Sequence, residues 1–138
     1  MSYFDEELTA DLKAFDISFD ILSESEHALM VSEINGKLPF SGSKIFWNTL
    51  EKSINFGLAS SNLAISQLAE QIKKYTDDDL VFISDSACDE AYAIDPKHVC
   101  QALKIFSEFP QHTYIVSKSL NWIACISFEG DLDFVKLS

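Results

Sequence analysis

The chain has 138 residues, which suits one domain, and its 47% hydrophobic content with eleven Phe argues against intrinsic disorder. It carries 22 acidic residues against ten lysines and no arginine, for a formal net charge of −12. Because arginine is the preferred side chain for binding phosphate and an acidic chain is repelled by it, nucleic acid and anionic membranes are disfavoured partners. The net negative charge favours a basic partner. The alternative interpretation is that the charge only keeps the protein soluble.

No apolar run approaches the roughly 20 residues of a membrane-spanning helix. The N-terminal segment, MSYFDEELTADLK, lacks the basic and apolar regions of a secretory signal. We therefore expect a cytoplasmic protein. The three cysteines (Cys88, Cys100 and Cys125) form no CxxC pair and are expected to be reduced core residues.

The first part of the chain predicts a helix followed by strands. Residues 5–15 place apolar side chains at helical spacing, and residues 16–23 alternate as a half-buried strand does, although they also fit a continuing helix. Residues 27–34 are a second strand candidate. Asn35-Gly36 follows them, and this pair is a strong signal for a two-residue hairpin turn.

The middle of the chain predicts two helices and a strand. Residues 38–44 are expected to form a loop, and 45–57 a helix that ends at a glycine. Residues 60–76 show the clearest apolar stripe, with serines that can cap the helix and lysines in its last turn. Three consecutive aspartates form a turn before 80–84, a short buried strand.

The C-terminal part predicts a sheet. Residues 84–94 are expected to be a loop, and Asp95-Pro96 starts a helix, with Asp as the cap and Pro in the first turn. Three strand candidates follow at 112–118, 121–128 and 131–137. Because strands gather at the C-terminus, the sequence favours one α+β domain with a largely antiparallel sheet and a C-terminal β-meander packed against helices.

The sequence contains no motif for a cofactor or a metal ion. GxGxxG, GxxxxGK[ST], HExxH, CxxC and the EF-hand loop are all absent, so we expect neither group. Cys88, with His98 nearby in the sequence, is a candidate for a small hydrolase with a Cys/His site. A catalytic thiolate needs positive surroundings, however, and the acids beside Cys88 should raise its pKa. We therefore expect no enzyme activity.

The acidic residues cluster along the sequence. Nine lie in 1–35, seven in 77–95 and three in the final hairpin, whereas 36–76 is net basic. Loops on a rigid scaffold often bind partners, and tyrosine is frequent at binding hot spots, although Tyr92 is equally suited to being a half-buried loop residue. The candidate binding residues are Asp77, Asp78, Asp79, Asp85, Asp89, Glu90, Tyr92, Asp95, Glu129 and Asp131.

Residues 93–137 also carry a recognisable pattern, a helix that leads into a strand and then a closing hairpin. Its residues are His112, Thr113, Tyr114, Ile115, Trp122, Ser127, Glu129, Gly130, Asp133 and Phe134. This stretch resembles the end of many bacterial immunity proteins, which are encoded beside polymorphic and contact-dependent growth-inhibition toxins. A plain structural role for the same residues, in the core and the turn, is also possible.

The resemblance implies a cytoplasmic, non-enzymatic inhibitor that binds the C-terminal domain of one cognate toxin. Many such toxins are nucleases with basic clefts, which an acidic protein can block by mimicking the charge of nucleic acid. The alternatives are the Cys/His enzyme and an acidic adaptor for another basic protein. The sequence leaves the oligomeric state open.

Overall fold

The computed structural model describes residues 1–138 except 39, 42–43, 46–52, 77 and 138. The helices are α1 (Tyr3–Ala14), α2 (Glu24–Lys37), α3 (Asn62–Tyr75) and α4 (Val99–Phe106), with a 3-10 turn, η2 (Pro96–His98), before α4. The strands are β1 (Phe19–Ile21), β2 (Phe40–Ser41), β3 (Lys44–Ile45), β4 (Ile54–Leu58), β5 (Leu80–Ser84), β6 (Tyr92–Ile94), β7 (Thr113–Ser117), β8 (Trp122–Ile126) and β9 (Asp131–Lys136).

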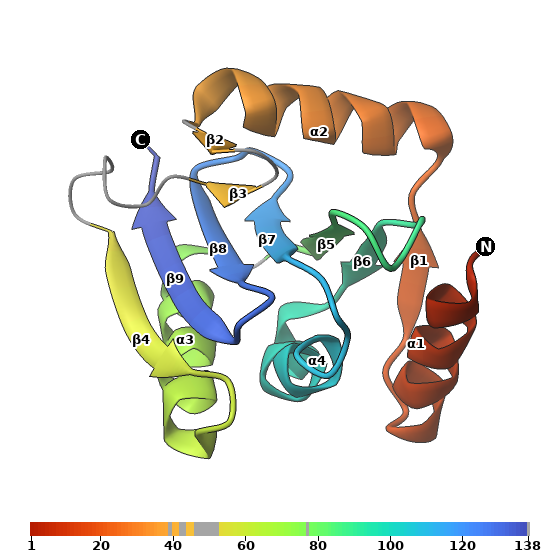
Figure 1. Ribbon diagram of the computed structural model, residues 1–138, viewed down its shortest axis with the longest axis horizontal. Coiled ribbons are helices and arrows are strands. Elements are labelled where there is room, and N and C mark those ends of the chain that lie inside the picture. Colours follow the sequence, from red (N-terminus) through yellow and green to blue (C-terminus); the bar gives the residue numbers. More distant parts are fainter. Residues whose placement is uncertain (39, 42–43, 46–52, 77, 138) are drawn as a thin grey trace.

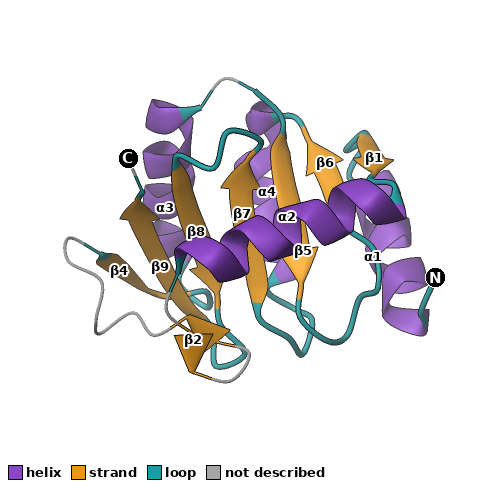
Figure 2. Ribbon diagram, turned by 90° about the horizontal axis from the view of Figure 1, so that it is seen from above, coloured by secondary structure: helices purple, strands orange, loops and turns teal. Residues whose placement is uncertain are grey.

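Seven strands form one antiparallel sheet in the order β1-β6-β5-β7-β8-β9-β4, and β2 pairs with β3 separately. Three helices, α1, α3 and α4, cover one face of the sheet, and α2 crosses the other face (Figures 1 and 2). The strands β7, β8 and β9 pair in succession, which makes the C-terminal meander. The predicted α+β class, antiparallel sheet and meander are confirmed.

The larger core lies between the sheet and the three helices. Phe106 of α4 stacks on Phe82 of β5 with ring centroids 4.5 Å apart, and Trp122 stacks on Phe134 at 5.7 Å. On the other face, α2 contributes Met30, Ile34 and Leu38, just past its end, to a smaller buried cluster. Burying these large apolar side chains is the main term that stabilises the fold.

Side-chain caps set where several helices begin. Ser2 and Asp5 form a capping box at α1, and Ser23 and Glu26 form one at α2. Ser61 caps α3, in the region where the sequence predicted a helix. Asp95 caps η2 as predicted, with its carboxylate accepting a hydrogen bond from the Lys97 N–H at 2.9 Å.

The prediction of a strand at 27–34 is wrong, because these residues lie within α2. The capping box at Ser23 starts a helix, and residues 30 and 34 then point to the sheet at helical spacing. Asn35-Gly36 lies inside this helix and makes no hairpin turn. In the predicted strand at 16–23, residues 19–21 form β1.

Three other expectations need correction. The helix predicted at 45–57 is wrong at both ends. Ile45 belongs to β3, and residues 54–57 belong to β4, which pairs with β9; residues 46–52 lie outside the described residues. The loop predicted at 38–44 contains parts of β2 and β3, and the loop predicted at 84–94 ends in β6. Among the described helices, none is long and apolar enough to cross a membrane.

Candidate functional site

The strands β5 and β6 divide the predicted acidic segment between the two ends of the sheet. Asp78 and Asp79 precede β5 and Asp95 follows β6, and the pairing of Leu80 with Ile94 places these acids at one end. Asp85, Asp89 and Glu90 lie in the loop that joins β5 to β6 at the other end. Asp77 lies outside the described residues. The candidate residues therefore do not form one surface.

The turn between β8 and β9 lies at the same end as the β5–β6 loop, because Ser84 pairs with Thr113 and Thr113 pairs with Ile126. We call the loops 85–91, 107–112 and 127–130 the acidic end; they lie along the lower side of the sheet in Figure 2. These loops contain carboxylates and no lysine. Their acids are Asp85, Asp89, Glu90, Glu108 and Glu129, and Asp131 opens β9 beside them.

At the opposite end of the sheet, acids and lysines alternate. Asp95 is followed by Lys97, and the β7–β8 turn begins with Lys118. The last turn of α3 adds Lys73 and Lys74, whereas the last turn of α4 brings one lysine, Lys104, next to the acidic end. Because cations at the opposite end lie among its acids, the acidic end is the better candidate for binding a positively charged partner.

A buried carboxylate holds the β5–β6 loop in place. Asp5 of α1 is 0% exposed and accepts hydrogen bonds from the backbone N–H groups of Asp89 at 2.7 Å and Glu90 at 3.2 Å. The Tyr92 hydroxyl donates to it at 2.7 Å, and Ser2 donates through its N–H and its hydroxyl. This network joins α1 to the loop, so the exposed acids of the loop stand on a fixed backbone.

Opposing effects act on the pKa of Asp5. Burial raises it, but the hydrogen bonds from Ser2, Tyr92 and the Asp89 backbone outweigh burial and hold the pKa below its ordinary value of 3.8. Asp5 is thus a carboxylate at neutral pH, and hydrogen-bond donors stabilise its charge. Burial is the main cause that raises the pKa of the Tyr92 phenol, followed by its hydrogen bond to Asp5 and the charge of Asp5. The sequence signal for Asp5 was its spacing of three residues from Ser2, typical of a capping box.

Tyr92 is a correction to the candidate set. It is 0% exposed, packs edge-on against Phe19 and Phe106, and donates its hydroxyl to Asp5. A side chain buried in this way cannot contact a partner protein. The exposed aromatic side chain at the acidic end is instead Phe128, 61% exposed at the β8–β9 turn, which the sequence analysis did not select.

His112 links the β5–β6 loop to the β8–β9 turn. Its backbone N–H donates to the Asp85 carboxylate at 2.8 Å, and its carbonyl accepts from the Asp85 N–H at 3.1 Å. Its ring Nδ1 accepts a hydrogen bond from the Phe128 N–H at 2.9 Å. These bonds hold the backbones of the two loops at fixed positions relative to one another.

The Cys/His site of the enzyme alternative is not assembled from Cys88 and His98. Cys88 lies in the β5–β6 loop, whereas His98 lies before α4, at the opposite end of the sheet. Burial, reinforced by the charge of Asp5, raises the pKa of Cys88 to about 11, so the thiol is protonated at neutral pH. The expected rise is confirmed, although burial, not the neighbouring acids, is its main cause. No group of three potential metal ligands occurs within the described ranges.

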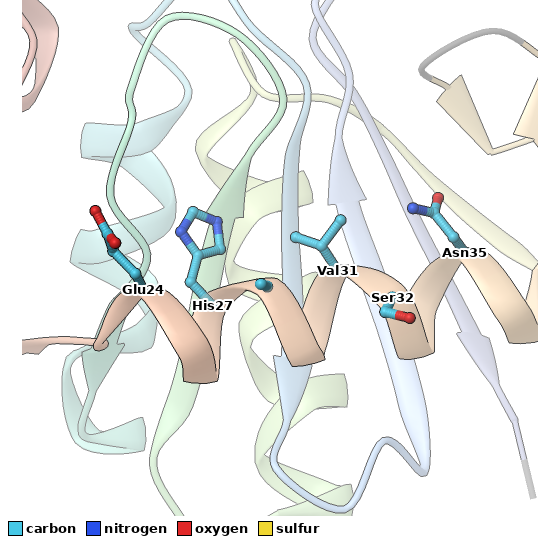
Figure 3. Close-up of a pocket in the computed structure, with 6 residues that line it drawn as sticks. Glu24, His27, Val31, Ser32 and Asn35 are labelled. Atoms are coloured by element: carbon cyan, nitrogen blue, oxygen red, sulfur yellow. The ribbon is translucent and has the colours of Figure 1, made fainter.

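An open groove of about 570 Å³ runs along α2 (Figure 3). Its described lining comes from one helix at intervals of three and four residues: Glu24, His27, Ala28, Val31, Ser32 and Asn35. A binding or catalytic site normally brings groups together from several elements. This groove is therefore a weaker candidate than the acidic end.

The chain matches no protein-family model, and the comparisons with curated proteins and with solved structures find no match.

Proposed function

We propose that this protein is an immunity-type inhibitor that binds a basic toxin domain through the acidic end. The observation that carries the proposal is the gathering of carboxylates on three adjoining loops that contain no lysine. Like charges brought together repel one another, and a cationic partner relieves that repulsion. The resemblance of residues 93–137 to immunity proteins supports the same function.

The fixed shape of these loops supports a tight inhibitor. Asp5 holds the β5–β6 loop from α1, and His112 connects that loop to the β8–β9 turn. Loops that are ordered before binding lose little conformational entropy in the complex. Their charge also speeds the encounter with a positively charged surface, which suits a protein that must neutralise a toxin quickly.

The test is rescue from toxicity, with the predicted toxin domain encoded immediately upstream of this chain as the partner. That domain is expressed with and without this protein, growth is scored, and the dissociation constant is measured at low and high salt. We expect rescue and an affinity that falls as salt rises, because salt screens exposed charges. A toxic domain that this protein neither binds nor neutralises would refute the proposal.

The two ends of the sheet provide matched variants. At the acidic end, the triple variant is Asp85→Asn, Asp89→Asn and Glu90→Gln; at the opposite end, it is Asp78→Asn, Asp79→Asn and Asp95→Asn. Both remove three negative charges, and asparagine still accepts the hydrogen bonds made at positions 85 and 95. We expect about a tenfold weaker complex for the first variant, mainly through slower association, and little change for the second. Equal effects would show that total charge, not its placement, matters.

A further inference from the structure

A large aromatic side chain is displayed at the acidic end without being part of the core. Phe128 is 61% exposed, and it follows Ser127, which is buried at the end of the meander strand β8. A single exposed apolar residue is ordinary on a protein surface. The position of Phe128, on a tightly bonded turn among carboxylates, is what sets it apart.

Hydrogen bonds within the turn and to His112 hold the backbone that carries Phe128. The Ser127 N–H donates to the Asp131 carbonyl at 2.9 Å, the Gly130 N–H donates to the Ser127 carbonyl at 2.9 Å, and the Asp131 N–H donates to the Ser127 hydroxyl. The Phe128 N–H itself donates to His112 Nδ1 at 2.9 Å. The backbone from which the Phe128 ring projects is therefore fixed.

The turn is also joined to the neighbouring edge strand, which adds apolar surface. The Ala59 N–H donates to the Gly130 carbonyl at 2.7 Å, and Leu58, the last residue of β4, pairs with Asp131 and is 51% exposed. Phe128 and Leu58 therefore lie on adjoining segments. Asp131, which pairs with Leu58, follows the turn that carries Phe128. Apolar groups with acidic neighbours are typical of an interface with a buried centre and a charged rim.

We infer that Phe128 is the apolar anchor of the interface with the basic toxin domain, an inference that rests on the proposed function. The partner surface is expected to hold an apolar pocket for the ring, with lysine or arginine side chains facing Asp85 and Asp131. Anchors of this kind are commonly aromatic and lie near the centre of an interface, where charged neighbours give orientation and association rate. Because the backbone of the turn is already ordered, binding costs little backbone entropy there.

The test measures binding of the upstream toxin domain to the full chain and its variants by titration calorimetry. Phe128→Ala removes the ring, and Phe128→Tyr keeps it. The matched control is Phe15→Ala, which removes a ring that is 57% exposed at the end of α1. Phe15 lies at the opposite end of the sheet from the acidic end. Because both replaced side chains are exposed, thermal unfolding should show the three variants to be folded.

We expect Phe128→Ala to weaken the complex at least about tenfold, with Phe128→Tyr and Phe15→Ala staying within about threefold of the wild type. The loss should persist at high salt, because it removes apolar contact and not charge. If the wild type binds and Phe128→Ala binds equally well, the anchor is refuted while the proposed function stands. If the wild type does not bind the domain, the proposed function and the anchor are refuted together.

Discussion

Replacing the buried carboxylate of Asp5 tests whether it holds the acidic end in shape. Asp5→Asn preserves the size of the side chain but removes its charge and one of its two acceptor oxygens. In the wild type, Oδ2 accepts from Ser2 and the Asp89 N–H, and Oδ1 accepts from the Glu90 N–H and the Tyr92 hydroxyl. Each donor must find a substitute in the variant or remain without one.

The cost follows from the best orientation of the new amide. If its oxygen takes the place of Oδ2, the bonds from Ser2 and Asp89 are kept, and the NH₂ faces Glu90 and Tyr92. The Tyr92 hydroxyl can rotate to accept, but the Glu90 N–H loses its acceptor, at about 1–2 kcal/mol. The retained hydrogen bonds are also weaker, because their acceptor is no longer charged. Together these effects lower the free energy of unfolding by about 3 kcal/mol. For a chain of this size that corresponds to a fall in Tm of about 10 °C.

The assay is urea denaturation at pH 7, with Glu6→Gln as the control, because Glu6 is an exposed acid of the same first helical turn. Glu6→Gln should change the free energy of unfolding by at most about 0.5 kcal/mol. A cost of less than about 1 kcal/mol for Asp5→Asn would refute the reasoning. Such a small cost would mean that every buried donor still has an acceptor in the variant.

The pH dependence checks the role of the charge. The pKa of Asp5 is lower in the folded protein than the ordinary 3.8, so the unfolded chain binds a proton at this position first as the pH falls. The stability that the carboxylate contributes is therefore complete above the unfolded-state pKa and is lost as the pH falls through the folded-state pKa. The wild type and Asp5→Asn should converge over that range, and a constant difference throughout would contradict a charge effect.

Three further predictions concern single positions. Tyr92→Phe removes a donor to the buried carboxylate and should cost about 1.5–2 kcal/mol in urea denaturation; an unchanged free energy of unfolding would show the bond to be dispensable. Because burial raises its pKa to about 11, Cys88 should react with a thiol reagent at neutral pH only on unfolding, after the half-buried Cys100; Cys88→Ser should keep the fast phase of the wild type. Gly130→Ala should destabilise by about 1–2 kcal/mol because φ is +94°, whereas Gly36→Ala, inside α2 with open space around it, should stabilise by about 0.5–1 kcal/mol.

Elements whose local signals agree could be predicted from the sequence. In α3, the apolar stripe, the serine cap and the terminal lysines all indicate one helix, and the structure has it at Asn62–Tyr75. The C-terminal strands were predicted because short runs rich in apolar residues lie between turn signals, and Gly130 marks the last turn. The helix α2 was missed because its buried residues, Met30 and Ile34, lie among exposed apolar ones, so that no stripe is visible.

The candidate site was predicted only in part, because neighbours in the sequence are not neighbours on the surface. The strand β6 has three residues, too few for a pattern, and without it the run of acids from 77 to 95 reads as one loop. Once β5 and β6 are paired, Asp79 and Asp95 lie at one end, and Asp85 and Glu90 lie at the other. The exposure of Phe128 likewise depends on where the turn ends, which the sequence does not specify.

The acidic end combines two kinds of carboxylate that the sequence alone cannot tell apart. Asp5 is buried and engaged by several donors, so its charge is compensated within the fold, and it holds the β5–β6 loop in place. Asp85 and Asp89 are exposed to the solvent. Because Asp5 fixes the backbone of the loop that carries the exposed acids, these acids repel one another in the free protein without moving apart. Under the proposed function, a basic partner surface would relieve that repulsion, and this relief would favour binding.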